Sequence, residues 1–352
     1  MKIILPINRN IPYGGMLRDM NRIVAITSNS LALPWYINNF IPQLMYDTFN
    51  IHCYDAENTY EIFNIYDEVA EFKLLEIGDD LQSIIESLKK EEYVLVNWDR
   101  YYVKQSNDYL KKHQYQEALI YGFDSGKNSF NYHESLINNK DYDTSEIAYD
   151  DLYLALRQSL EKTQQMEARN WQFAFSHPFS SFSIKKQFPK LNLRKMYHNF
   201  YTQLQGAEIE FSYGGNVKKK YYSGMMIFKG LQTLLNDLEN NESLERYNQA
   251  IWSIKIFSQH MKSHEVRFKY VMEQNYIFFE QDIFDQIELV SRKLMIFFSL
   301  LRKYAVTLSK IDLSRARELL IEIKELYLLF LKRANILIEN AIVNTKNNYG
   351  DE

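Results

Sequence analysis

The sequence predicts an α+β protein whose N-terminal half mixes strands and helices and whose C-terminal half is helical. Short apolar runs alternate with helical patterns from residue 2 to about residue 182. From about residue 191 onward, apolar residues recur every three or four positions. The 352 residues include only 11 Gly and 6 Pro, which argues against long linkers and most all-β folds. We therefore predict two domains, at residues 1–185 and 186–352.

The first domain is expected to contain a sheet with helices between its strands. The turn Asp124–Asn128 predicts a hairpin, and Asp79-Asp80 marks a helix start, where the helix dipole favours acidic residues. The expected strands are residues 3–5, 50–54, 60–66, 72–77, 93–98, 118–123 and 129–132. The expected helices are residues 16–29, 81–90 and 150–165, with a further helix starting at Pro34. An aromatic stretch, residues 171–182, closes this half.

The second domain is expected to be a helical bundle or a lid on the first. One predicted buried face consists of Ile283, Ile287, Val290, Leu294, Phe297, Leu301 and Tyr304. Asp312 can cap the last helix. Because helices of about thirty residues exceed the usual length, these helices could pair two chains as a homodimer.

Composition narrows the classes of partner. The 41 basic and 45 acidic residues give a formal charge of −4, whereas nucleic-acid binders usually carry a basic surplus. Cys53 is the only cysteine, so an internal disulfide is impossible. No apolar run approaches the about 18 residues of a membrane span, and the N-terminal run is too short for a secretion signal. We expect no nucleic-acid or membrane partner and a cytoplasmic location.

Two histidines and the cysteine raise the question of metal or thiol chemistry. His260 and His264 lie one helical turn apart, but a metalloprotease motif needs Glu where Met261 stands, and no third ligand is evident. An exposed or lightly buried pair without metal is therefore expected. His52 precedes Cys53 in a predicted strand, where neighbours point to opposite faces, so a buried structural cysteine is expected.

Two further features could bind anions. Gly14-Gly15 precedes a helix whose free amides could hold an oxyanion, but the Lys of a P-loop is missing. The run Lys218–Lys220 is the only basic cluster of its kind, and a solvated loop is the simpler interpretation. Docking of an acidic carrier protein on these lysines remains an alternative.

Three segments together resemble one known family. They are LKKEEYVLVNWDRYYVKQSNDYLKKHQYQEALIYGFDSGKNSFNYHES, ALPWYINNFIPQL and YYSGMMIFKGLQTLLNDLE. The chain is similar to proteins related to the N-terminal domain of the butirosin biosynthesis protein BtrH, over most of its length. The resemblance implies a papain-like fold for residues 1–185, with an antiparallel sheet, followed by the helical bundle. It also implies acyl transfer from a carrier-protein thioester to an amine by a Cys-His-Asp triad.

The resemblance places the triad on Gly15, Gln116 and Glu134 or its neighbour His133. Glycine cannot form an acyl-enzyme, and an amide cannot serve as a general base. The resemblance therefore implies a degenerate site. The cleft residues that it suggests, besides these positions, are Tyr13, Gly14, Trp98, Asp99, His113 and His133.

Three functions follow as expectations. The first is a non-catalytic accessory protein in a biosynthetic pathway for peptide- or antibiotic-like products. It would bind a carrier protein, the phosphopantetheine-linked acyl chain of that carrier, or an active paralogue. No cofactor of its own is expected. The second is acyl transfer without covalent catalysis, in which Glu134, His133 or Asp99 takes the proton. The third is a helical scaffold or dimerisation protein.

Overall fold

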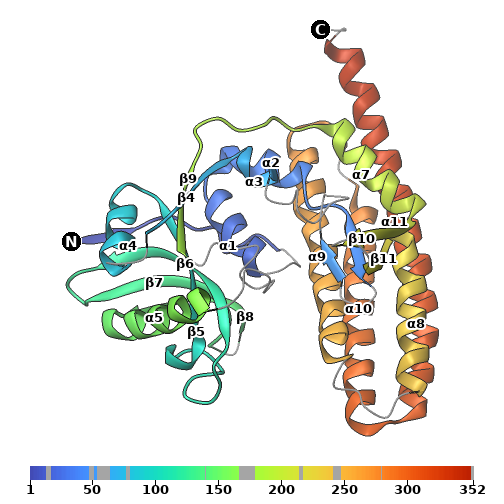
Figure 1. Ribbon diagram of the computed structural model, residues 1–352. Helices are drawn as coiled ribbons and strands as arrows, with labels where there is room; N and C mark the ends of the chain where they lie inside the picture. The colour runs from blue at the N-terminus through green and yellow to red at the C-terminus, as the bar shows by residue number, and fades with distance from the viewer. Residues whose placement is uncertain are drawn as a thin grey trace. The chain divides into compact units, whose positions relative to one another are not determined.

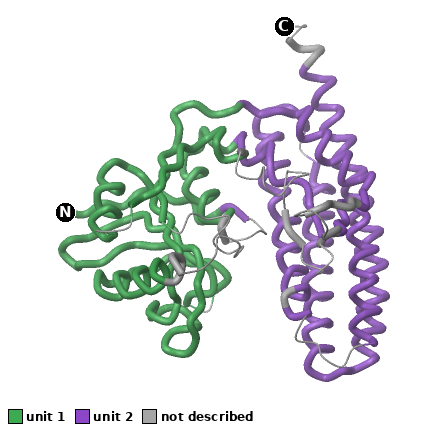
Figure 2. Tube along the Cα trace, viewed as in Figure 1, with its two compact units in different colours: residues 1–10, 16–33, 63–189 green, residues 11–15, 34–62, 190–352 purple. Residues whose placement is uncertain are grey.

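The computed structural model describes residues 1–12, 17–46, 51–53, 64–76, 80–138, 140–165, 179–213, 217–240, 247–278 and 280–349. The chain divides into two compact units (Figure 2). Unit 1 comprises Met1–Asn10, Met16–Leu33 and Phe63–Pro189. Unit 2 comprises Ile11–Gly15, Pro34–Ile62 and Lys190–Glu352. Residues 34–62, which the sequence placed in the first domain, thus belong to the second unit.

Unit 1 is built on an antiparallel sheet whose strands follow the order β4-β9-β5-β6-β7-β8, with β1 paired to β6 (Figure 1). The strands are β1 (Lys2–Ile4), β4 (Ala70–Leu74), β5 (Tyr93–Asp99), β6 (Tyr115–Asp124), β7 (Ser129–Ile137), β8 (Lys140–Ala148) and β9 (Phe179–Ile184). Every residue of β5 is buried. A strand of this kind is covered on both faces, which makes β5 the centre of the unit.

Among the residues that the structure describes, three helices cover the sheet of unit 1. Helix α1 (Leu17–Ile26) packs on β6 and β7, α4 (Asp80–Lys89) on β5 and β6, and α5 (Tyr149–Gln165) on β5. Short helical turns complete the unit: η1 (Ser30–Ala32), α3 (Asn64–Asp67) and η3 (Arg100–Tyr102).

Unit 2 combines long helices with a small antiparallel sheet of order β10-β11-β2-β3. The helices are α2 (Leu33–Asn38), α7 (Leu193–Gln205), η4 (Gly224–Met226), α8 (Ile227–Asn240), α9 (Asn248–Glu273), α10 (Gln281–Thr307) and α11 (Lys310–Tyr349). The strands are β2 (Gln43–Tyr46), β3 (Ile51–Cys53), β10 (Ala207–Tyr213) and β11 (Val217–Ser223). The face of α10 predicted from residues 283–304 is buried, so the α+β class with C-terminal helices is confirmed.

Some predicted elements were wrong or missed. Asn64–Asp67 is helical where a strand was expected, and the strand β8 was not predicted. The sequence of β8, KDYDTSEIA, offers few apolar residues because this edge strand buries only two of its side chains. The hairpin β10–β11 interrupts the expected helical half, although the alternation AEIEF is a strand signal.

The basic run Lys218–Lys220 lies in strand β11 and not in a loop. Lys220 forms an ion pair with Glu208 on β10, and Glu208 also accepts a hydrogen bond from Lys229 at 2.6 Å. At least one of the three lysines is therefore engaged within the sheet.

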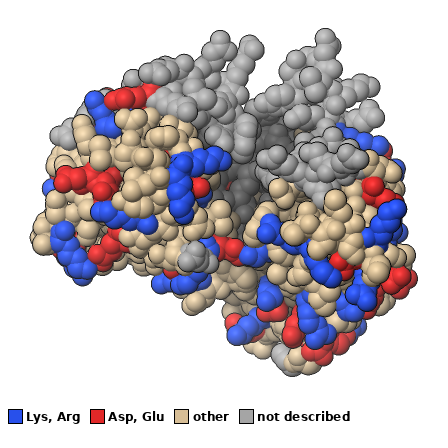
Figure 3. All heavy atoms as spheres, turned by 90° about the horizontal axis from the view of Figure 1, so that it is seen from below, with Lys and Arg blue, Asp and Glu red and all other residues tan. Residues whose placement is uncertain are grey.

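Acidic and basic side chains are interspersed on the face of the molecule shown in Figure 3. None of the helices within the described ranges is both long and apolar enough to cross a bilayer.

Candidate functional site

A buried polar cluster lies where α1 packs on β6 and β7. Asn21 and Arg22 come from the helix, Glu117 from β6 and His133 from β7. All four side chains are buried. We call these four residues the α1 cluster. Asn21 and Arg22 lie between the apolar residues Met20 and Ile23, and Glu117 directly precedes the apolar run that starts at Ala118.

The strongest interaction in the α1 cluster joins Arg22 to Glu117. Arg22 donates from Nη1 to Oε1 at 2.8 Å and from Nη2 to Oε2 at 3.1 Å. The guanidinium also lies 5.8 Å from the ring centroids of Tyr66 and Phe72. Such a bidentate ion pair fixes the orientation of both side chains. The aromatic faces help to offset the energetic cost of burying the positive charge.

Asn21 connects Glu117 to His133. Its Nδ2 lies 3.3 Å from Glu117 Oε1, and its Oδ1 lies 2.9 Å from His133 Nδ1. The carboxylate that pairs with Arg22 can only accept, so the amide nitrogen of Asn21 faces it and the amide oxygen faces the imidazole. An amide oxygen is an acceptor as well, so the proton of the neutral imidazole resides on Nδ1 and the lone pair on Nε2.

The imidazole of His133 is neutral at physiological pH. Burial lowers its pKa to about 4, and the positive charge of Arg9 acts in the same direction. Its ring lies parallel to that of Tyr142, with the centroids 6.1 Å apart. The α1 cluster thus presents an oriented, neutral base, but none of its four side chains is a nucleophile.

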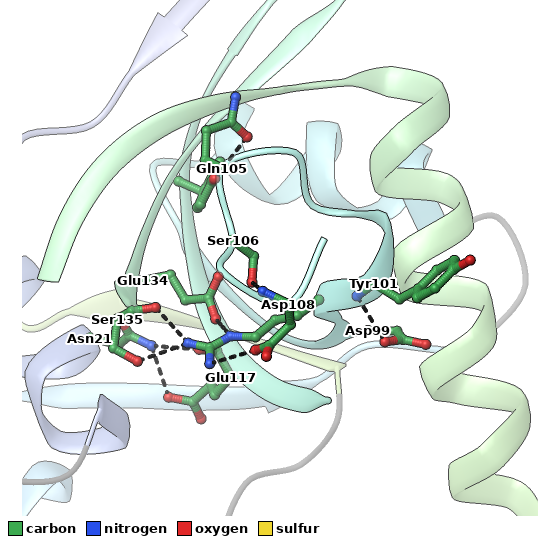
Figure 4. A network of polar contacts seen from close by, with 11 residues as sticks. Asn21, Asp99, Tyr101, Gln105, Ser106, Asp108, Glu117, Glu134 and Ser135 are labelled. Atoms are coloured by element: carbon green, nitrogen blue, oxygen red, sulfur yellow. Dashed lines mark hydrogen bonds and ion pairs between the residues drawn. The ribbon is translucent and has the colours of Figure 1, made fainter. Parts of the chain in front are cut away.

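A second buried network lies on the opposite face of β7, because neighbouring residues of a strand alternate between faces. Arg100 Nε donates to Glu134 Oε1 at 2.5 Å, and its Nη2 donates to the carbonyl oxygen of Ser135 at 2.5 Å (Figure 4). Asp108 completes the network 3.5 Å from Arg100 Nη1. Burial raises the pKa of Glu134 to about 7, although the charge of Arg100 lowers it. Glu134 therefore belongs to the Arg100 network and is separate from His133.

A third polar pair lies where β5 ends and β6 begins. His113 Nδ1 is 2.6 Å from Oδ2 of Asp99, which is fully buried. The other oxygen of Asp99 accepts the backbone N–H of Tyr101 at 3.1 Å, and the imidazole stacks on the Tyr101 ring at 4.3 Å. The side chain of His113 is 52% exposed. Because Nδ1–H donates to the carboxylate, Nε2 is the acceptor nitrogen of an accessible His-Asp pair.

Of the remaining predicted positions, Gln116, Trp98 and Asp99 are described by the structure, and these three do not form one open site. Gln116 is half-buried and pairs across the sheet with Trp98, whose ring packs edge-on against Tyr132 at 4.9 Å. Trp98 and Asp99 are both fully buried, so they form part of the core and do not line an open cleft. Tyr13, Gly14 and Gly15 lie outside the described residues.

The expectation that His260 and His264 are exposed or lightly buried was wrong. Both are fully buried in α9. His260 Nε2 donates to the carbonyl oxygen of Phe40 at 2.8 Å, and its Nδ1 accepts a hydrogen bond from Gln43. Burial lowers the pKa of His260 to about 3 and that of His264 well below its ordinary value. Cys53 lies in strand β3 as expected, opposite Gln43.

Asn21 and Arg22 were not recognised as site residues from the sequence. The available signal was this pair of polar residues between Met20 and Ile23 of the helix. In the ranges that the structure covers, no three His, Cys, Asp or Glu side chains group as metal ligands would. A scan against protein-family models and a search of curated proteins each found no match.

Proposed function

We propose that this chain is a papain-like acyltransferase homologue that binds a carrier-linked acyl group without forming an acyl-enzyme. The α1 cluster is the observation that carries the proposal. The cluster lies where helix α1 packs on the hairpin β6–β7. This hairpin resembles the strands that carry the His and the Asp of the triad in the family. There Arg22 holds Glu117 with two hydrogen bonds and Asn21 holds His133. These contacts stabilise the fold and leave no activated nucleophile.

The composition of the chain supports the same conclusion. The only thiol is Cys53, whose strand β3 is part of the sheet of unit 2, whereas the α1 cluster belongs to unit 1. The helix-start position that the resemblance assigns to the nucleophile is Gly15. Because the loss of a nucleophile removes the covalent intermediate altogether, we propose that binding is the activity this chain retains.

A direct test uses a carrier protein loaded with an octanoyl-phosphopantetheine arm. We expect saturable binding by fluorescence anisotropy and no increase in the intact mass of the protein after prolonged incubation. The Cys53→Ser variant is the matched control and should bind equally well. An octanoyl adduct on the wild-type chain that is absent from the Cys53→Ser variant would contradict the proposal, as would a lack of binding.

The His113–Asp99 pair favours a second candidate, acyl transfer without a covalent intermediate. In that reaction a neutral amine attacks the thioester carbonyl and its nitrogen forms the amide bond. His113 Nε2 accepts the proton from the nitrogen, the C–S bond breaks, and the departing thiolate takes up a proton. Asp99 keeps the imidazole in the required tautomer and stabilises its charged form.

For this second candidate, His113→Ala should reduce amide formation from octanoyl-carrier protein and a primary amine by about 10²-fold or more. Asp99→Asn should also reduce the rate, with a shift in its pH profile. His198→Ala is the control, since His198 is an exposed histidine on α7. Amide formation that is equally fast in wild type and His113→Ala would eliminate this candidate.

A further inference from the structure

Helices α9 and α10 run side by side in unit 2 and carry an exposed tryptophan. Ser258 on α9 donates to the carbonyl oxygen of Ser291 on α10 at 2.9 Å, so small residues let the two helices approach closely. Nearer the start of α9, the ring of Trp252 packs on Phe298 of α10, with the centroids 5.2 Å apart. Trp252 is nevertheless 40% exposed, which leaves a large apolar ring open to solvent.

Basic residues gather along the same stretch of both helices. From Asn248 to His264, α9 contains Lys255 and Lys262 but no acidic residue. From Leu289 to Ile311 there are five basic residues and no acidic one. They are Arg292, Lys293, Arg302, Lys303 and Lys310.

Contacts place four of these seven basic residues, two against α11 and two beside Trp252. Lys293 pairs with Glu322 and Lys303 with Asp312, so both face α11. Lys255 and Arg302 instead flank Trp252. Lys255 Nζ lies 5.2 Å and Arg302 Cζ 5.3 Å from the indole ring. We call Trp252, Lys255, Phe298 and Arg302 the Trp252 patch.

An exposed indole between two cations offers both apolar contact and positive charge. Tryptophan and arginine are the residues that most often dominate the energy of protein interfaces. Cations stacked on an aromatic ring are held in place before binding, which lowers the entropy lost on association. The surface is therefore suited to a partner with carboxylates around an apolar contact.

We propose that the Trp252 patch docks the acidic surface of a protein partner. The assignment of that partner as the carrier protein rests on the proposed function. A nucleic acid would also be attracted by the two cations, but the chain as a whole carries a formal charge of −4, which opposes binding to a polyanion. Charge complementarity at the patch steers the partner, and Trp252 provides the central contact.

The experiment measures binding of three probes to the full chain. They are octanoyl-carrier protein, a 20-residue peptide of Glu and Leu, and a 20-nucleotide single-stranded DNA. Trp252→Ala and the double variant Lys255→Glu/Arg302→Glu should each weaken carrier and peptide binding by about tenfold or more. Lys269→Glu, a charge reversal at an exposed site of the same helix, and Phe278→Ala, at an 87% exposed ring, are the controls and should bind normally.

The outcomes separate this inference from the proposed function. Carrier binding that is equally strong in wild type and all variants would overturn the docking surface and leave the proposed function standing. Peptide binding that depends on Trp252, without any carrier binding, would support the surface and contradict the proposed function. Tighter binding of the DNA than of either acidic probe would overturn the inference. Circular dichroism of the variants should match wild type, because none of the substituted side chains is fully buried.

Discussion

Glu117→Leu should lower the free energy of unfolding of unit 1 by about 3–5 kcal/mol. The substitution removes the carboxylate but leaves the guanidinium of Arg22 buried between β6 and the rings of Tyr66 and Phe72. The loss of a bidentate partner by a buried charge is among the most destabilising changes that a single substitution can cause. Urea unfolding, followed by hydrogen exchange of peptides from β6 and β7, measures the effect on this unit alone.

Two controls test the cause. The double variant Arg22→Met/Glu117→Leu removes both charges, and its stability should return to within about 1 kcal/mol of wild type or exceed it. Arg157→Ala breaks an exposed pair with Glu161 and should cost less than about 1 kcal/mol. A loss below about 1 kcal/mol in Glu117→Leu would mean that Arg22 remains solvated without its partner.

Unit 2 should lose stability steeply between pH 6.5 and pH 5. The folded-state pKa values of His260 and His264 lie below the ordinary value of 6.5, so the unfolded chain binds more protons than the folded chain in this range. Stability therefore rises with pH here and is lost as the pH falls. His260 should contribute a loss of about 2 kcal/mol over this interval, since one pKa unit corresponds to about 1.4 kcal/mol, and His264 should add a loss in the same direction. Denaturant unfolding at a series of pH values, read out by hydrogen exchange of α9, measures this loss.

Unit 1 is the internal reference for this experiment. The lowered pKa of His133, about 4, destabilises unit 1 as the pH falls below 6.5. The raised pKa of Glu134, about 7, acts oppositely, because its contribution to stability is present in acid and is lost as the pH rises from 4.5 through 7. These two effects largely cancel between pH 4.5 and 6.5, so unit 1 should respond less than unit 2.

The variant His264→Leu isolates the contribution of His264 to the loss of stability of unit 2 in acid. Among the described residues, the buried Nδ1 atom of His264 has no hydrogen-bond partner, and its ring packs against Phe200 and Phe330 at 5.2 and 5.3 Å. An apolar side chain should therefore be tolerated there and should reduce the loss of stability in acid. An unchanged pH dependence in His264→Leu would show that other groups cause the acid sensitivity.

Elements whose apolar residues recur at a regular spacing, or whose turn has a clear sequence signal, were predicted correctly. The repeating apolar residues of α10 and the hairpin around Asp124–Asn128 were both found, because each depends on local patterning or turn chemistry. Strand β2 was missed, since Gln43–Tyr46 directly follows a helix and pairs with β11, more than 170 residues further along the chain. Pairing of that kind has no local signal.

The candidate site was harder to predict because its polar residues depend on the register of the sheet. The sequence suggested His133 and Glu134 as alternatives for one role, whereas strand alternation places them in separate networks. His113 and Asp99 were suggested individually, and their pairing became evident only from the neighbouring ends of β5 and β6. The exposure of His260 and His264 was misjudged because the residues that bury them lie far away in the sequence. His260 bonds to Phe40 and Gln43, and His264 packs against Phe200 and Phe330.

Two strands that pair in the sheet of unit 2 are synthesised at widely separated times. Strand β2 ends at Tyr46, and its partner β11 begins at Val217, after the stretch Phe63–Pro189 of unit 1. At about 5–20 residues per second, the synthesis of the residues between the two strands takes about 9–34 s. During that time the growing chain exposes an unpaired strand edge that chaperones or neighbouring chains can contact. A fragment that starts at residue 186 would lack strand β2, so strand β11 would have no partner on that side. The helical half should therefore not fold when it is produced alone.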